Sequence, residues 1–280
     1  MTHAGSGRTT QAVILARGLG TRMRREAEGE TATLSDEQRR AAAQGAKGMM
    51  PLGGRPFLDY VLSTLADAGI TDVTLVVAPD HAQIAEYFGR THVPARVRIH
   101  YAVQAEPRGT ADAVLSVRGV VADAPFLVLN SDNYYPVAAF RDLAAVNGSG
   151  LVAFEAESLV RESRIEPERV LKFALLDIGD DDILRAVREK PSADDPLAQR
   201  AERWVSMNLW SFSPVIFEAC ARVRPSARGE LEIQDAVTIA MRELGEPFHV
   251  VRMRAGVLDM SSRADVAFVA SQLAGIEPRP

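Results

Sequence analysis

Residues 11–22 have the sequence QAVILARGLGTR, in which a short apolar run leads into a loop with two glycines. An apolar run of this kind, bounded by glycine, is typical of a buried strand. In a doubly wound α/β sheet, phosphates bind outside the carboxyl ends of the strands, and the loop after the first strand is a common site. The stretch therefore predicts an α/β fold with a phosphate-binding loop after its first strand.

Segments typical of strands and of helices alternate after this loop. In the first part of the chain we expect strands at residues 73–77, 97–102 and 126–129, and helices at 57–65, 81–88 and 110–117. Strands separated by helices form right-handed crossovers, which give a mostly parallel sheet. In the second part strands predominate, and we expect them at 151–154, 170–176, 183–187, 204–212 and 248–253, with helices at 214–221, 231–244 and 263–273. The pattern predicts a Rossmann-like, three-layer α/β fold, with a mostly parallel sheet, helices on both faces and a β-rich second half.

Nothing in the sequence divides the chain into separate domains, since it has no internal repeat, no low-complexity tract and no long linker. We expect a disordered N-terminus at residues 1–10 and a single domain at 11–273. Because the alternation of helices and strands changes near residue 150, this domain has two halves, at 11–150 and 151–273.

One segment of the first half looks like an insertion. Residues 24–46 are charged and alanine-rich, and Ser35 is a suitable N-cap for a helix near residues 36–44. We expect the insertion to be solvated, to contribute little to the core, and to act either as a mobile lid or as a permanent decoration of the surface.

The overall composition excludes several classes of protein. A net charge of −5 argues against a broad nucleic-acid-binding surface. Cys220 is the only cysteine, which excludes an intramolecular disulfide and a cysteine-based zinc site. No apolar run is long enough to span a membrane, and residues 1–10 lack the apolar centre of a signal peptide. We expect a cytoplasmic protein that binds small molecules and neither nucleic acid nor membranes; a homo-oligomer remains an open alternative.

Lysine is scarce in this chain. Of the 32 basic residues, only Lys47, Lys172 and Lys190 are lysine, and the other 29 are arginine. Lysine supplies a compact, rotatable point charge that arginine does not. These three positions are therefore candidates for specific roles.

The glycine-bearing loop has the groups that a phosphate needs. Gly18 and Gly20 let backbone N–H groups approach an anion, Thr21 adds a hydroxyl, and Arg22 adds a cation that can bind in a bidentate manner. The loop lacks the third glycine of a dinucleotide fingerprint and the Gly-Lys-Ser/Thr ending of a P-loop. Taken alone, it is as compatible with a plain tight turn as with a phosphate site.

Several further short blocks follow in order between residues 11 and 273. They are LARGLGTRM, KGMMPLGGRP from Lys47, QAEPRGTADAV from Gln104, NSDN from Asn130, REKP at 188–191, Met207-Asn208 and VLD ending at Asp259. In this order they resemble the signature of the sugar-1-phosphate nucleotidyltransferases, in particular the glucose-1-phosphate thymidylyl- and uridylyltransferases. The resemblance implies a nucleotide-binding half at 11–150, a sugar-binding half at 151–273, and transfer of a nucleoside monophosphate from an NTP to a sugar 1-phosphate with release of pyrophosphate.

The implied reaction sets the roles of the catalytic residues. A phosphate oxygen attacks the α-phosphorus while pyrophosphate leaves, so the enzyme must orient the reactants and neutralise charge, and it needs no nucleophilic triad. The resemblance makes Asp132 and Asp259 the two ligands of a Mg²⁺ cofactor. It places Arg22 on the β- and γ-phosphates and Lys47 near the α-phosphate. Without the resemblance, Asp132 could be a turn former after a strand and Lys47 an ordinary surface lysine.

The remaining site residues also follow from the resemblance. Nucleotide binding falls to Ala16, Gly18, Gly20, Thr21, Gln104, Gly109 and Thr110. The sugar and its phosphate fall to Asn133, Glu189, Lys190 and Asn208, with Glu189 on the sugar hydroxyls and Lys190 on the phosphate.

The choice of base depends on Gln104. Relatives that use UTP or dTTP read the pyrimidine with a glutamine five residues before a glycine, which is the spacing of Gln104 and Gly109. A side-chain amide offers a donor and an acceptor side by side, so it can pair with a ring N–H and the neighbouring carbonyl. UTP or dTTP is therefore favoured, although the GTADAV run also resembles relatives that use adenine or guanine nucleotides. Asp112, near the start of a predicted helix, could reach the substrate, but the favoured interpretation is that it complements the helix dipole.

Some positions depart from the family pattern. Arg17 replaces a small residue of the loop, Gly48 replaces a proline, and the 24–46 insertion is longer than in relatives, which indicates an unusual substrate or a divergent subgroup.

Three other functions remain alternatives. A cytidylyltransferase for a phosphorylated alcohol or choline-like group would use aromatic faces such as those of Tyr134, Tyr135, Trp204 and Trp210. A catalytically silent regulatory homologue would bind nucleotide sugar and partner proteins. A metal-dependent glycosyltransferase could use residues 131–133 as its acidic motif.

Overall fold

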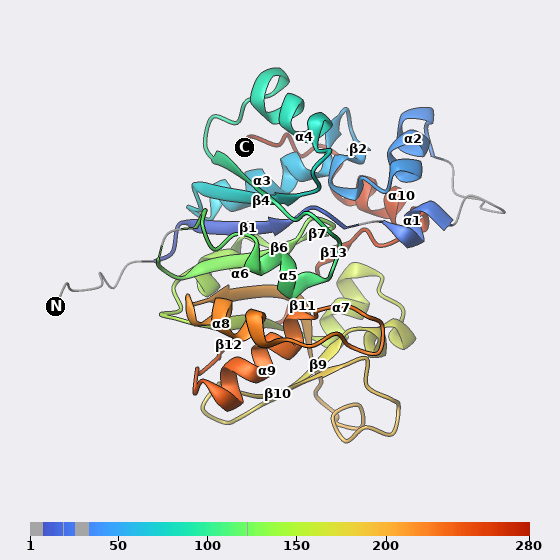
Figure 1. Ribbon diagram of the computed structural model, residues 1–280. Helices are drawn as coiled ribbons and strands as arrows, with labels where there is room; N and C mark the ends of the chain where they lie inside the picture. Colours follow the sequence, from blue (N-terminus) through green and yellow to red (C-terminus); the bar gives the residue numbers. More distant parts are fainter. Residues whose placement is uncertain (1–7, 19, 26–33, 122) are drawn as a thin grey trace.

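The computed structural model describes residues 8–280 apart from residues 19, 26–33 and 122. Within these residues a nine-stranded sheet forms the centre of the molecule, in the order β10-β9-β11-β6-β1-β4-β5, with β8 paired to β11 and β12 paired to β8 (Figure 1). The strands are β1 (Gln11–Leu15), β4 (Asp72–Val77), β5 (Arg98–Val103), β6 (Phe126–Asn130), β8 (Gly150–Glu155), β9 (Ala174–Ile178), β10 (Leu184–Glu189), β11 (Trp204–Phe212) and β12 (His249–Met253).

The predicted first strand lies inside the parallel part of the sheet. β1 pairs in parallel with β4 on one side and β6 on the other, and β4 pairs in parallel with β5. Ala12, Val13 and Ile14 are at most 1 % exposed, because strands in such a position are covered on both faces. The strands predicted at 73–77 and 126–129 are confirmed to within a residue at either end.

The second half is joined to the first through one antiparallel strand. β11 runs antiparallel to β6, β8 and β9, and β10 runs antiparallel to β9. β12 runs parallel to β8. All strands of this sheet except β10 and β11 therefore share one direction, and the prediction of a mostly parallel sheet with a β-rich second half is confirmed.

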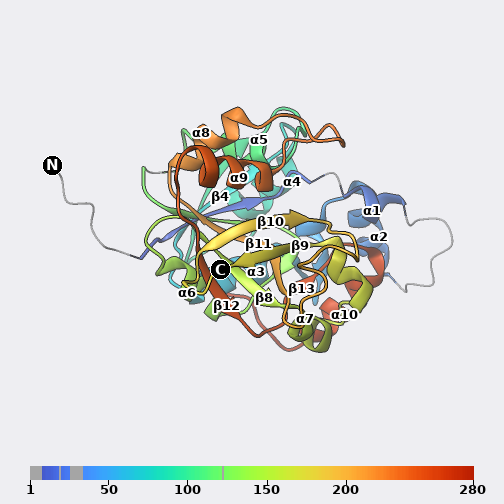
Figure 2. The same cartoon turned by 90° about the horizontal axis from the view of Figure 1, so that it is seen from below.

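Helices cover both faces of the sheet (Figures 1 and 2). Alternate residues of β1 belong to different cores, Ala12 and Ile14 to one and Val13 to the other. The first core includes α3 (Phe57–Asp67) and α6 (Val137–Ala144), and the second includes α5 (Thr110–Leu115), α8 (Val215–Arg222) and α9 (Ile233–Glu243). The three-layer prediction is confirmed. No helix among the described residues is long and apolar enough to cross a bilayer.

Three local predictions differ from the structure. Residues 170–176 were expected to be one strand, but η3 (Pro167–Lys172), a 3₁₀-helix, comes before β9. Pro167 at its start favours helical over extended backbone. The helix expected at 81–88 is α4 (Ala82–Glu86) continued by the π-helical η2 (Tyr87–Thr91). The helices α6 and α7 (Ala156–Ser163) were not predicted.

The N-terminal prediction is wrong for residues 8–10. The Thr9 N–H donates to the Ala144 carbonyl at 3.0 Å, and the Thr10 carbonyl accepts from Thr71 and Asp72. These hydrogen bonds fix the backbone of Thr9 and Thr10, directly before β1, to neighbouring segments. The rest of the predicted disordered segment, residues 1–7, lies outside the described residues.

The insertion at 24–46 is partly a core element. Ser35 caps α2 (Asp36–Gln44) as predicted, in a capping box with Gln38. Leu34, Ala41 and Ala42 are buried in the same core as β1 and α3, so the expectation of a solvated segment is wrong for this part. Residues 26–33 of the insertion lie outside the described residues.

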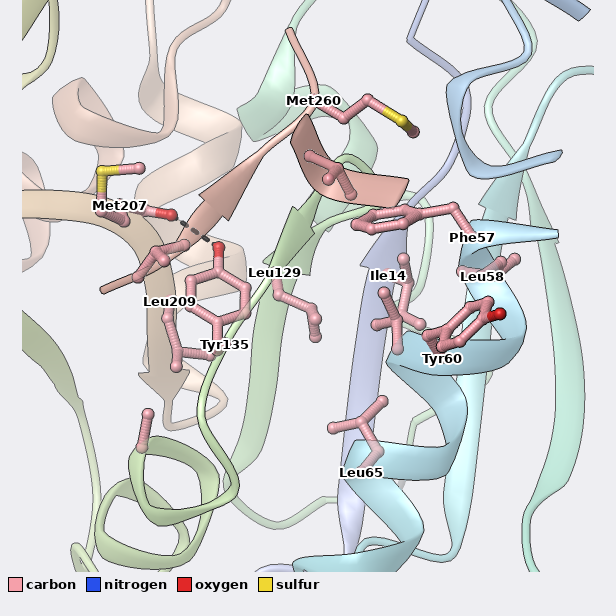
Figure 3. Packing of buried hydrophobic residues seen from close by; sticks show 14 of the residues in the cluster. Ile14, Phe57, Leu58, Tyr60, Leu65, Leu129, Tyr135, Met207, Leu209 and Met260 are labelled. Carbon is pink, nitrogen blue, oxygen red and sulfur yellow. Dashed lines mark hydrogen bonds between the residues drawn. The ribbon is translucent and has the colours of Figure 1, made fainter. Parts of the chain in front are cut away.

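A buried tyrosine connects the segment after β6 to β11. Tyr135 is completely buried, and its hydroxyl donates to the Met207 carbonyl at 2.6 Å (Figure 3). Met207 lies directly before Asn208, a predicted sugar contact, and Tyr135 follows Asn133, another one. The hydrogen bond therefore holds together two segments that carry predicted site residues.

We predict that Tyr135→Phe lowers the free energy of unfolding by about 1–3 kcal/mol, because it leaves the buried Met207 carbonyl without its partner. Tyr134→Phe is the matched control, since Tyr134 is only partly buried, and it should change stability little. Urea unfolding of the two variants measures the difference. Equal stability of both would show that the Tyr135 hydroxyl contributes nothing.

Candidate active site

Two adjoining cavities lie at the carboxyl ends of β1 and β6. The larger has a volume of about 930 Å³ and the smaller about 340 Å³. Both volumes are within the usual range for small-molecule sites. The cavities share a wall that is formed by Leu15, Gly20, Thr21, Lys47, Thr110, Asn130, Asp132 and Glu230.

The larger cavity contains the predicted nucleotide residues. Its lining includes all seven of them, namely Ala16, Gly18, Gly20, Thr21, Gln104, Gly109 and Thr110. The two loop glycines serve different purposes. A Cβ at Gly18 would meet nothing within 4 Å, so this position leaves space for a ligand, whereas a Cβ at Gly20 would lie 2.6 Å from the backbone of Gly45, at the end of α2. Gly20, with φ of 56°, thus lets the loop pack against the insertion.

Gln104 lies at the end of β5 and is only 4 % exposed. Its side-chain Nε2 donates to the Gly109 carbonyl at 3.0 Å and to Asp112 Oδ2 at 2.8 Å. Gly109 has φ of 123°, and a Cβ there would lie 2.4 Å from the Leu231 carbonyl oxygen. Asp112 was expected to complement the dipole of α5; the structure gives it a specific partner as well.

Arg17 reaches across to the segment that follows β5. Its Nε donates to the Gln104 carbonyl at 2.6 Å, and its Nη2 donates to the Ala105 carbonyl at 3.0 Å. The arginine that departs from the family pattern therefore fixes the backbone beside Gln104 to the glycine-bearing loop.

The shared wall of the cavities carries an ion pair. Lys47 Nζ lies 2.7 Å from Asp132 Oδ2, and each side chain is 19 % exposed. Lys47 begins η1 (Lys47–Met49), the short 3₁₀-helix after the insertion, while Asp132 follows β6. Two segments that are distant in sequence thus bring opposite charges to the point where the cavities meet.

A short strand pair places the second predicted metal ligand next to the first. β7 (Asn133–Tyr134) is antiparallel to β13 (Leu258–Asp259), with Asn133 opposite Asp259. The Met260 N–H donates to the Asp132 carbonyl at 2.9 Å, and Asn133 Nδ2 donates to Asp259 Oδ1 at 3.3 Å. Both carboxylates line the smaller cavity.

The electrostatics of Asp259 indicate a shortage of positive charge. Burial, and then the negative charge of Asp132, raise the pKa of Asp259 to about 6. Arg169 Nη2 lies 3.0 Å from Asp259 Oδ2 and offsets part of this effect, and the Ser261 hydroxyl donates to the same carboxylate.

These residues fit a Mg²⁺ ion that arrives with phosphates. In the part of the chain that the structure describes, no group of three or more histidine, cysteine or acidic side chains could hold a metal alone. Mg²⁺ commonly binds through one or two carboxylates together with substrate phosphates and water. Asp132 and Asp259 supply that number, and a cation held by them would offset the burial and the repulsion by Asp132 that raise the pKa of Asp259.

The smaller cavity contains the predicted sugar-phosphate residues Asn133, Glu189, Lys190 and Asn208. Lys190 and Asn208 have φ of 46° and 59°, in the left-handed region that non-glycine residues seldom adopt. Asn208 lies in a bulge of β11, and its Oδ1 accepts from Gln234 Nε2 at 3.2 Å. Burial raises the pKa of Glu189, and Lys190 at 3.7 Å counteracts the shift.

Charged groups that the sequence did not assign also line the smaller cavity. They are Arg169, Arg228, Glu230, Glu232 and, as the third of the scarce lysines, Lys172. Arg228 and Glu232 form an ion pair at 2.7 Å. The scarcity of lysine makes Lys172 a candidate for a specific role, although the sequence assigned it none, and no sequence motif marks the others. Arg22, which the resemblance placed on the β- and γ-phosphates, lines this cavity and not the larger one.

A glycine-bearing loop with a buried glutamine beside it, and a pair of carboxylates in the adjoining cavity, can serve an enzyme that binds a nucleotide next to a second small ligand. Comparison with known families is more specific. Residues 41–255 match the model of the nucleotidyl transferase family, which is most of the chain. The chain therefore belongs to the nucleotidyl transferase family, as its sequence motifs predicted.

Curated relatives agree with this assignment. UTP–glucose-1-phosphate uridylyltransferase AglF of Haloferax volcanii is 28 % identical over 255 residues, which covers 91 % of this chain and 93 % of the relative. Glucose-1-phosphate thymidylyltransferase of Streptomyces griseus is 28 % identical over 230 residues, covering 81 % of this chain. The chain spans 56 % of the length of that enzyme. It is 30 % identical over 193 residues to the low-salt glycan biosynthesis nucleotidyltransferase Agl11 of Haloferax volcanii, and it spans 50 % of the length of Agl11.

Solved structures share the fold. A UTP-bound UGPase from Acinetobacter baumannii superposes with a TM-score of 0.72 at 18 % identity, covering 96 % of this chain and 94 % of that chain. A UDP-glucose pyrophosphorylase complexed with UDP-glucose gives 0.70 at 16 % identity, covering 94 % and 97 %. These matches confirm the α/β architecture.

We predict that Arg17→Ala raises KM for the NTP about tenfold and changes kcat little, because we expect the loop that Arg17 holds to contact the nucleotide equally before and during transfer. Arg17→Lys should restore only part of the loss, since an ammonium cannot bind both carbonyls as a guanidinium fork does. Steady-state kinetics distinguish the parameters. A loss of kcat with unchanged KM would contradict a role in holding the loop.

Proposed function

We propose that this enzyme transfers a nucleoside monophosphate from an NTP, with UTP or dTTP favoured, to a sugar 1-phosphate and releases pyrophosphate. The observation that carries the proposal is that the predicted nucleotide residues line one cavity, the predicted sugar-phosphate residues line its neighbour, and Lys47 and Asp132 belong to both. The names of the relatives, a uridylyltransferase and a thymidylyltransferase for glucose 1-phosphate, support the substrate class.

In this proposal the reaction occurs at the wall between the cavities. An oxygen of the sugar phosphate attacks the α-phosphorus, and the bond from that phosphorus to the pyrophosphate oxygen breaks. Lys190 holds the sugar phosphate in the smaller cavity, and Glu189 and Asn208 orient the sugar. Lys47 leaves Asp132 to neutralise the charge that develops at the α-phosphate. Arg22 lines the smaller cavity next to the shared wall, and it reaches across that wall to neutralise the leaving pyrophosphate.

Asp132 and Asp259 are the residues that would hold Mg²⁺, which supplies positive charge to the phosphates when it is bound. Arg169 holds the Asp259 carboxylate in place and compensates part of its negative charge while no cation is bound. Ser261 and Asn133 hydrogen-bond the same carboxylate and fix its orientation.

The alternatives find less support in the structure. A choline-like group would need exposed aromatic faces in the site, but Tyr135 and Trp210 are at most 1 % exposed, and Tyr134 and Trp204 line neither cavity. Membership of the nucleotidyl transferase family argues against a glycosyltransferase. Lys47 and both carboxylates are present, which argues against a silent homologue. A cytoplasmic location, the absence of nucleic-acid and membrane partners, a homo-oligomer, and closure of residues 24–46 over the nucleotide stay predictions.

The direct experiment is to incubate the enzyme with each NTP, Mg²⁺ and a panel of sugar 1-phosphates and to measure pyrophosphate. Formation of pyrophosphate that depends on both substrates supports the proposal. No pyrophosphate with any pair would overturn it.

We predict that Asp132→Asn and Asp259→Asn each lower kcat at least about 10²-fold, the scale of losing an electrostatic contact to the transition state. Asp142→Asn, which changes an exposed carboxylate on α6, is the matched control and should retain full activity. A variant of Asp132 or Asp259 with near wild-type turnover at saturating Mg²⁺ would remove that residue from the metal site.

We predict that Lys47→Ala lowers kcat more than it raises the KM of the nucleotide, because charge at the α-phosphate develops mainly in the transition state. Arg22→Ala should change both parameters, since the charge that it neutralises is present before and after transfer. If Lys47→Ala changed KM alone, Lys47 would contribute only to binding of the substrate.

A further inference from the structure

The side-chain amide of Gln104 has both of its donors occupied in the larger cavity. Nε2 carries two N–H groups, and it donates to the Gly109 carbonyl and to Asp112 Oδ2. Gln104 can therefore offer a ligand only its carbonyl oxygen, Oε1. This corrects the expectation that the amide pairs with both a ring N–H and a neighbouring carbonyl.

Asp112 determines which way round the amide lies. A backbone carbonyl and a carboxylate can only accept hydrogen bonds, so turning the amide over would place Oε1 against two oxygens and leave the buried Nε2 without these partners. The carboxylate is the stronger of the two acceptors because it is charged. The Asp112 side chain is 21 % exposed, which limits how far water can replace this contact.

The backbone around Gln104 is held from both sides. The Gln104 N–H donates to the Val77 carbonyl at 3.0 Å, and Arg17 binds the carbonyls of residues 104 and 105. On the other side, the Leu231 N–H donates to the Arg108 carbonyl at 2.7 Å, and the Leu231 carbonyl accepts from Ala111. Because the backbone is fixed in this way, rotation of the Gln104 side-chain amide is the main motion that remains. The hydrogen bond to Asp112 prevents this rotation.

We propose that Asp112 is a positioning residue that determines base specificity by holding Gln104 as a hydrogen-bond acceptor. The inference rests on the proposed function, because it assigns the larger cavity to the base of an NTP. A fixed acceptor favours bases that present a ring N–H, which are uracil and thymine at N3 and guanine at N1. Cytosine and adenine have an acceptor at the equivalent ring nitrogen, and they are disfavoured.

Pairs of bases of equal size test this selection. The wild-type enzyme should prefer UTP over CTP, and GTP over ATP, by at least about tenfold in kcat/KM, the usual scale when a buried polar group loses its partner. Asp112→Asn should reduce both preferences to within about threefold, because asparagine can donate as well as accept and so permits the amide to turn over. Asp112→Ala, which removes the carboxylate without adding a donor, should reduce them too.

A double-mutant cycle with Gln104→Ala distinguishes positioning from a general structural effect. If Asp112 acts through Gln104, Asp112→Asn has no further effect on the preferences in the Gln104→Ala enzyme. Glu157→Gln is the matched control, because it also removes a first-turn carboxylate, at an exposed position of α7. It should leave the base preferences unchanged, because Glu157 lines neither cavity.

Three results would overturn the inference: no preference in either pair, unchanged preferences in both Asp112 variants, or an equal effect of Asp112→Asn with and without Gln104. Nucleotide Kd values measured by calorimetry without sugar phosphate give the same ratios independently of turnover. If no NTP is turned over, the proposed function fails, while these binding ratios still decide the role of Asp112.

Discussion

The ion pair between Lys47 and Asp132 is the interaction on which the site depends. It lies where the two cavities meet, and both side chains are mostly buried, so neither charge is stable there without the other or a substitute. A phosphate can substitute for the carboxylate, and a cation can substitute for the ammonium. In the proposed reaction, the ion pair would hold both charges until the substrates bind, and each charge would then pair with a substrate group or a cation.

Strand β11 and the segment at residues 230–231 bring the two halves of the site together. β11 joins the parallel strands of the first half to the second half, and its bulge holds Asn208 in the smaller cavity. The backbone of Leu231 packs against Gly109 beside the larger cavity, while Glu230 lines both cavities. A substrate in one cavity therefore contacts segments that also form the other.

Much of this arrangement could be predicted from local sequence. The apolar run of β1 and the glycines after it are adjacent in the chain, and the scarcity of lysine is visible without any structure. By contrast, the contact of Arg169 with Asp259 depends on a 3₁₀-helix where the apolar run at 170–176 predicted a strand. The contacts of Gln104 with Asp112 of α5 and with Arg17 depend on side-chain geometry between separate segments, and neither residue pair has a characteristic spacing. The family motifs identified the site, but tertiary packing determines how its members are oriented.

In the proposed reaction the nucleotidyl group passes directly between two substrates that are bound side by side across Lys47 and Asp132. Exchange of labelled pyrophosphate into the NTP can be measured with and without a sugar 1-phosphate that the enzyme accepts. Direct transfer predicts no exchange until the second substrate or the nucleotide-sugar product is present, because the α-phosphate then has no acceptor on the protein. Rapid exchange with NTP and pyrophosphate alone would reveal a nucleotidyl-enzyme intermediate and rule out direct transfer.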